Sequence, residues 1–144
     1  MSFREKSAWI TFLLLLFVFG FYFVSLGMHL IWSEHPMPNF FAVLLVLLLA
    51  ILVVEVALHI LAAMRSPDDA KAPQDERERL VALKAKRPAF FVLMVSAFFS
   101  IATVHVSGHF RLGQGLVANG ILFSMWLGEL TNYGAQLYYY RRGT

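Results

Sequence analysis

Four long apolar runs restrict what this chain of 144 residues can fold into. They cover approximately residues 8–32, 39–63, 89–110 and 115–139. The hydrocarbon core of a bilayer takes about 20 apolar residues as a helix, so each run is long enough to cross it. Hydrophobic residues make up 59% of the sequence, whereas soluble domains contain roughly 45–50%. The sequence therefore predicts an integral membrane protein.

The runs predict helices, because they show no alternation of apolar and polar residues with a period of two. Inside lipid, backbone N–H and C=O groups must be satisfied within the segment or in a closed barrel. We predict an all-α fold, a four-transmembrane-helix bundle made of two helical hairpins, with residues 1–144 in a single membrane domain. The first run is too long for a cleavable signal core, and we expect a retained span.

The distribution of positive charge predicts the topology. Eleven of the twelve Lys and Arg residues lie before the first run, between the second and third, or after the fourth. By the positive-inside rule, both termini and the loop at 65–88 face the cytoplasm, and the protein lies in the cell inner membrane. The same cations can contact anionic lipid. They are Arg4, Lys6, Arg65, Lys71, Arg77, Arg79, Lys84, Lys86, Arg87, Arg141 and Arg142.

A short amphipathic helix is predicted in the cytoplasmic loop. Asp75 can cap its first turn while Glu78, three residues later, returns to the cap backbone. Because a proline disfavours a helical conformation in the residue before it, we expect a kink or a short break near Pro88. The residues expected to contact a partner or lipid head groups are Asp75, Glu76, Arg77, Arg79, Lys84 and Lys86.

The segment Asp75-Glu76-Arg77-Glu78-Arg79-Leu80, followed by the span that begins near Phe90, carries a family likeness. It resembles an uncharacterised group of small predicted membrane proteins with an Asp-Glu-Arg signature before a span. A second similar patch runs from Glu129 to Gly143, and the resemblance covers mainly the C-terminal half. It implies a membrane-bound control element that works with a separate helix-turn-helix regulator. Pro88 departs from the pattern of the group.

Polar side chains inside the spans predict an intramembrane site. Glu55 and His59 are four residues apart and share a helix face. A carboxyl group in a span costs at least ~2.5–3.5 kcal/mol on insertion scales, so we expect it to have partners. If this face meets the polar face of the fourth span, the side chains together form a protonatable or cation-binding site. The alternative is that they only form hydrogen bonds that hold the helices together. The polar stripe on the fourth span consists of Glu129, Asn132, Tyr133 and Gln136.

Histidines toward the opposite membrane face suggest a metal site. His105 and His109 are one helical turn apart, and two imidazoles at this spacing can chelate Zn²⁺ or Cu²⁺. His29, at the end of the first span, can supply a third ligand. The alternative is that these rings lie at the membrane interface and contact head groups and water.

Two ridges of small residues predict close helix packing, within one chain or between copies in a homo-oligomer. One consists of Gly120, Ser124 and Gly128, and the other of Ser96, Ser100, Thr103 and Ser107.

The sequence favours a sensor or binding protein that reports through residues 75–87 to a separate cytoplasmic regulator. It contains no phosphate-loop glycines, nucleophile elbow or helical zinc-protease motif, so we do not expect an enzyme. The loop is too short to be a DNA-binding domain, so we expect no direct nucleic-acid binding. One alternative is an oligomeric transporter or channel subunit, and a monomeric protein in mild detergent would argue against it. The other is an accessory subunit of a membrane complex, which copurification with the other subunits would reveal.

Overall fold

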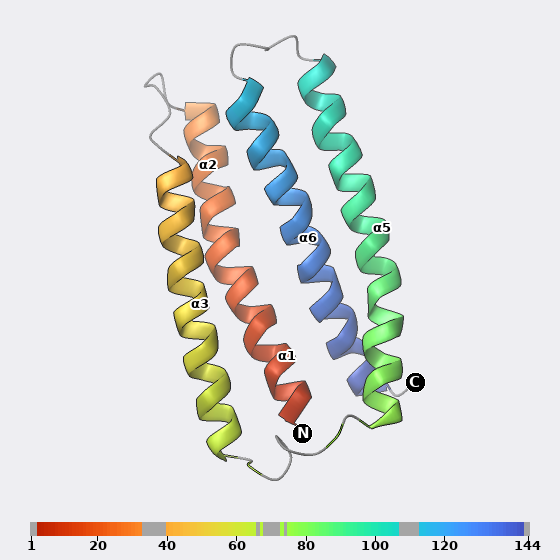
Figure 1. Ribbon diagram of the computed structural model, residues 1–144. Coiled ribbons are helices and arrows are strands. Elements are labelled where there is room, and N and C mark those ends of the chain that lie inside the picture. Colours follow the sequence, from red (N-terminus) through yellow and green to blue (C-terminus); the bar gives the residue numbers. More distant parts are fainter. Residues whose placement is uncertain are drawn as a thin grey trace. The chain divides into compact units, whose positions relative to one another are not determined.

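The computed structural model describes residues 3–32, 40–65, 67, 73, 75–106 and 113–142 (Figure 1). These residues form helices and parts of their connections, with no strand among them, so the all-α prediction is confirmed. The chain divides into two compact units, Met1–Pro73 and Gln74–Thr144. Each unit is a helical hairpin, as predicted.

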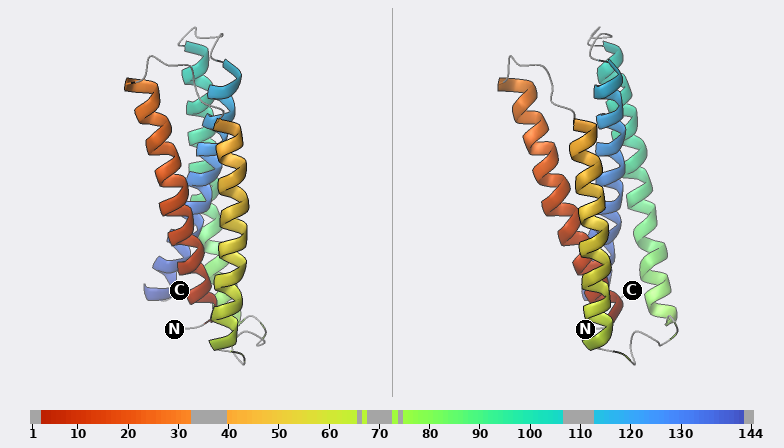
Figure 2. Two further views of the ribbon diagram at one scale, coloured as in Figure 1. Left: turned by 90° about the vertical axis from the view of Figure 1, so that its left-hand side faces the viewer. Right: turned by 60° about the vertical axis from the view of Figure 1, so that its left-hand side comes forward.

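The first hairpin pairs an irregular helix with a regular one. The irregular helix consists of α1 (Phe3–Leu14), the π-helical segment η1 (Leu15–Phe19) and α2 (Gly20–Trp32), and its partner is α3 (Phe40–Arg65). α1 packs on α3, whereas α2 diverges from it in both views of Figure 2. Contacts between the two arms are therefore concentrated where α1 meets the C-terminal half of α3.

Apolar side chains cover the outside of this hairpin. On α3, Val46 and Val53 are exposed, and Phe21 is exposed on α2. An apolar surface of this extent indicates that lipid surrounds these helices. Two helices of this hairpin are long and apolar enough to cross a bilayer, over Phe3–His29 and Ala42–Arg65.

The second hairpin consists of α5 (Glu76–Val106) and α6 (Gly113–Arg142), which pack closely against each other. Its core consists of small and medium side chains, among them Val81, Ala85, Ser124 and Leu137, all buried. The small-residue ridge on α6 lies at this contact: a Cβ atom on Gly120 would come within 3.0 Å of the Ser100 Cβ atom, and one on Gly128 within 3.1 Å of the Leu93 Cβ atom. The predicted close packing is confirmed for these residues.

At the start of α5, Glu78 returns to the backbone of Asp75 as predicted, whereas the cap from the Asp75 side chain stays a prediction. The backbone N–H of Asp75 donates to Glu78 Oε2 over 3.4 Å, and Asp75 O accepts from the Arg79 N–H over 3.0 Å. A short break at Pro88 is wrong, since α5 continues through it as one helix, and the alternative of a kink stays a prediction. The buried residues Ala85 and Ala89 lie on either side of the proline. Their packing holds the helix across the missing backbone hydrogen bond.

The fourth predicted span differs from the other three. α5 supplies a third helix that is long and apolar enough to cross a bilayer, over Glu76–Ala102. At 30 residues α6 is also long enough, but among the described residues it does not reach the same hydropathy. The physical reason is its polar content, which includes Asn119, Glu129, Asn132 and Gln136.

Candidate functional site

Two polar contacts join α1 to α3 inside the first hairpin. Thr11 Oγ1 donates to Glu55 Oε1 over 2.8 Å, and Ser7 Oγ lies 2.8 Å from His59 Nε2. Both pairs use residues four apart on their own helix, which places the side chains on one face, one turn above the other. We call these four residues the polar ladder. It is the point at which sequence and packing bring hydroxyl, carboxyl and imidazole groups together.

The polar ladder is partly enclosed by its own hairpin. Thr11 is buried, and Glu55 and His59 are half-buried. His59 Nδ1 is buried with no hydrogen-bond partner, although Nε2 contacts Ser7. In this pair either the hydroxyl donates to Nε2 or the ring N–H donates to the hydroxyl. The ring can therefore exchange which nitrogen carries the proton while its contact with Ser7 is kept.

A second polar arrangement follows α6. Gln136 Nε2 donates to Asn132 Oδ1 over 3.2 Å, and Asn132 Nδ2 donates to Glu129 Oε2 over 3.3 Å. The predicted stripe thus forms a hydrogen-bonded row along one helix, and Tyr133 lies on the same helix. Glu129 is exposed, so this row is more open than the polar ladder.

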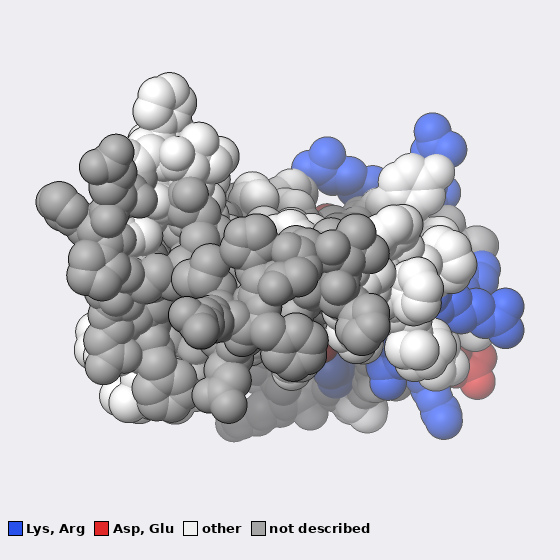
Figure 3. All heavy atoms as spheres, turned by 90° about the horizontal axis from the view of Figure 1, so that it is seen from above, with Lys and Arg blue, Asp and Glu red and all other residues white. Residues whose placement is uncertain are grey.

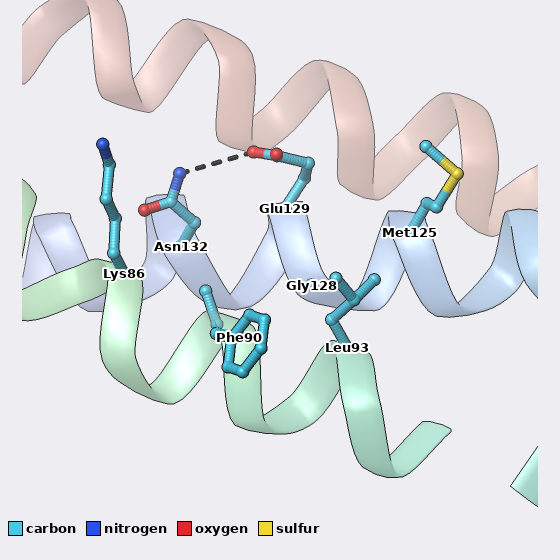
Figure 4. Close-up of a pocket in the computed structure, with 8 residues that line it drawn as sticks. Lys86, Phe90, Leu93, Met125, Gly128, Glu129 and Asn132 are labelled. Atoms are coloured by element: carbon cyan, nitrogen blue, oxygen red, sulfur yellow. Dashed lines mark hydrogen bonds between the residues drawn. The ribbon is translucent and has the colours of Figure 1, made fainter. Parts of the chain in front are cut away.

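Beside this row, α5 and α6 form a groove of about 350 Å³. Figure 4 shows Lys86 and Asn132 at one end of it and Leu93 and Met125 at the other. Gly128 allows the two helices to approach here, since its Cα faces Leu93 and the Ala89 carbonyl. We call this depression the α5–α6 groove.

The glutamates of the predicted intramembrane site lie in different hairpins. Glu55 and His59 belong to the first unit, while Glu129, Asn132, Tyr133 and Gln136 belong to the second. Each hairpin has its own contacts for these groups, and a cluster that joins Glu55 to Glu129 stays a prediction.

The proposed metal ligands lie largely outside the described part of the chain. His29 is described and lies near the end of α2. The side chain of His105 and the whole of His109 lie outside the described residues. Among the residues that the structure describes, no group of three or more His, Cys, Asp or Glu side chains is placed to hold a metal ion.

The predicted partner-contact segment forms the first turns of α5. Arg77 Nη2 donates to the Tyr140 carbonyl over 3.3 Å, which ties the start of α5 to the end of α6. Such a contact satisfies a carbonyl that a helix end would otherwise leave open. Asp75, Glu76, Arg79, Lys84 and Lys86 are exposed. Figure 3, which views one face of the molecule, shows Lys and Arg atoms at several places on the surface and fewer Asp and Glu atoms.

Sequence reasoning missed Ser7 and Thr11, the partners of His59 and Glu55. The signal was available in the sequence, since two hydroxyl residues four apart at the start of the first helical segment match the spacing of Glu55 and His59 on the second. Serine and threonine are common in spans for packing, so this spacing acquires meaning only once the helices are known to face each other.

Helix content and hydropathy define a helical membrane protein with more than one helix that is long and apolar enough to cross the bilayer. Residues 6–144 match the model of a family described as predicted membrane protein (DUF2178). The match covers nearly the whole chain, and the chain belongs to this family. The likeness is therefore wider than the C-terminal half expected from the sequence. Comparison with curated proteins gave no match, and comparison with solved structures gave none.

Proposed function

We propose that this protein is a small inner-membrane sensor that responds to a proton or a small cation at the polar ladder and reports through the first turns of α5 to a cytoplasmic partner. The observation that carries the proposal is the pairing of Glu55 with Thr11 and of His59 with Ser7. Both α3 residues can change their charge, and both contact the neighbouring helix. A change of charge on either residue therefore alters the contact between α1 and α3.

The energetics favour a role beyond packing. A carboxyl group within a span costs at least ~2.5–3.5 kcal/mol on insertion scales, whereas an interhelical hydrogen bond in a membrane averages only ~0.6 kcal/mol. The hydrogen bond from Thr11 does not offset the cost of Glu55. An apolar residue at this position would stabilise the hairpin more, so we infer that the carboxyl group is kept for its chemistry.

The start of α5 is suited to contact with a cytoplasmic partner. Its exposed residues include both acids and bases, which allows recognition by a protein as well as by lipid. The segment is too short to bind DNA as a domain, so the partner we propose is a separate regulator. The basic residues at the start of α1 and the end of α6 agree with cytoplasmic termini.

A labelling experiment tests the coupling between the polar ladder and α5. The chain has no cysteine, so Ala82→Cys introduces a single thiol into α5. Relative to a free thiol alkylated in the same buffers, we expect its rate of alkylation in native membranes to change by at least about fivefold between mildly acidic and mildly alkaline buffer, or on addition of the sensed cation. Glu55→Gln should abolish the change, because the amide cannot ionise.

Glu34→Gln is the matched control, an acid outside the polar ladder, and it should keep the response. A rate that follows only the intrinsic ionisation of the thiol in every variant would contradict the proposal. The same would be true if Glu55→Gln responded as fully as the control. His59→Gln provides a second variant in case Glu55→Gln fails to accumulate in the membrane.

A further inference from the structure

The α5–α6 groove changes in polarity along its length. Its apolar end is formed by Leu93 and Met125, with Phe90 beside them. Its polar end holds Lys86, Asn132 and Glu129, which Figure 4 shows as a row along the two helices. The groove therefore has the polarity of an amphiphile that lies along the helices with its head at the Lys86 end.

The charges at the polar end are opposite but do not neutralise each other. Lys86 and Glu129, both of which the structure describes, line the same groove without forming an ion pair with each other. The contact of the Glu129 carboxylate is with the amide of Asn132. An occupant that bears an anion and a cation a few ångströms apart would complement both residues.

Lys86 lies at the boundary between the polar start of α5 and its apolar part. Lys86 stands three residues before Ala89, where the apolar part of α5 begins. A lysine at this level extends its ammonium group to the membrane surface. On α6, Glu129 lies three residues from Asn132, which is about 4.5 Å along the helix axis at 1.5 Å per residue. Glu129 is therefore nearer than Asn132 to the apolar end of the groove. The apolar end of the groove continues in the same direction, toward the hydrocarbon.

We propose that the α5–α6 groove binds a phospholipid with a primary ammonium in its head group, of the phosphatidylethanolamine type. The phosphate lies against Lys86, the ammonium folds back to Glu129, and an acyl chain follows Phe90, Leu93 and Met125. A purely anionic head group would leave the Glu129 charge uncompensated near the hydrocarbon, which is costly. A quaternary ammonium has no N–H to donate to the carboxylate, so choline lipids fit less well.

The test is lipid retention measured by native mass spectrometry. The full chain is purified into micelles that contain equal amounts of phosphatidylethanolamine, phosphatidylcholine and phosphatidylglycerol. We expect the ethanolamine lipid to be retained about tenfold more than either of the others. Glu129→Gln should remove the preference for ethanolamine over glycerol, and Lys86→Gln should reduce retention of all three lipids.

Matched variants separate the groove from the general charge of the protein. Arg87→Gln removes a neighbouring cation that does not line the groove, and Glu5→Gln removes an acid of the first hairpin, so both should retain wild-type selectivity. Glu129→Asp keeps the negative charge and should keep the preference for the ethanolamine lipid. If it does, loss of the preference in Glu129→Gln is due to loss of the charge and not to misfolding.

Equal retention of the three lipids by the wild type would overturn the proposal. So would a Glu129→Gln variant with unchanged selectivity. A dimer that dissociates in Glu129→Gln while lipid retention is unchanged would instead assign the groove to a second copy of the chain.

Discussion

Gly120 and Gly128 show how little space separates α5 from α6. An added Cβ atom would lie 3.0 Å from the Ser100 Cβ at the first position and 3.1 Å from the Leu93 Cβ at the second. Neither neighbour can move aside easily, because a Cβ atom is fixed to its own backbone. Ser124, between the two glycines, is buried and lies 3.3 Å from Ser100 by their hydroxyl oxygens.

Gly120→Ala should therefore destabilise the second hairpin. Extra methyl groups in a well-packed contact cost about 1–3 kcal/mol, and the gain in helix propensity offsets part of this. The measurement is the free energy of unfolding in micelles, followed by circular dichroism during denaturant titration. Gly27→Ala is the control, since its Cβ would meet nothing within 4 Å. Equal stability of the two variants would contradict the packing described.

For individual residues, the sequence predicted which side chains share a helix face but not which side chains on other helices they contact. Glu55 and His59 share a face because of the helical repeat, which is a local property. Their partners Ser7 and Thr11 depend on which helix faces α3. Hydropathy does not reveal this in a membrane, because lipid-facing and protein-facing surfaces are both apolar.

Among the elements, α5 is the one whose course the sequence predicted least well. Its start was predictable from Asp75 and Glu78, since capping is a local hydrogen-bond pattern. Its continuation through Pro88 was not, because the cost of a proline in a helix is outweighed here by packing of the residues on either side. The position and length of α6 were predictable from its apolar run, whereas its row of amide contacts required the side-chain geometry.

Pro88→Ala should stabilise the protein. The alanine supplies the backbone N–H that proline lacks, directed at the Lys84 carbonyl, and the gain is at most about 3 kcal/mol. The same denaturant titration measures it. Pro73→Ala, at an exposed position outside the described helices, should have no comparable effect. A loss of stability in Pro88→Ala would show that α5 needs the local geometry of the proline to pack on α6.

For the molecule as a whole, the distribution of charge makes the strongest prediction. Because the ends of α3 and α6 and the first turns of α5 are basic, the positive-inside rule predicts that all three face the cytoplasm. Single thiols introduced by Arg79→Cys and Arg142→Cys should react with an impermeant maleimide only in inverted vesicles. Glu34→Cys, between the first two spans, should react only in right-side-out preparations. Labelling of all three from one side would contradict the topology.

The polar ladder also bears on how the chain enters the membrane during synthesis. Glu55 and His59 find their hydroxyl partners within residues 3–65, so the first hairpin contains those contacts before the second is translated. A carboxyl group is costly in a span, and a hydrogen bond to the neighbouring span lowers that cost. We therefore expect the first pair of spans to insert without the remainder of the polypeptide.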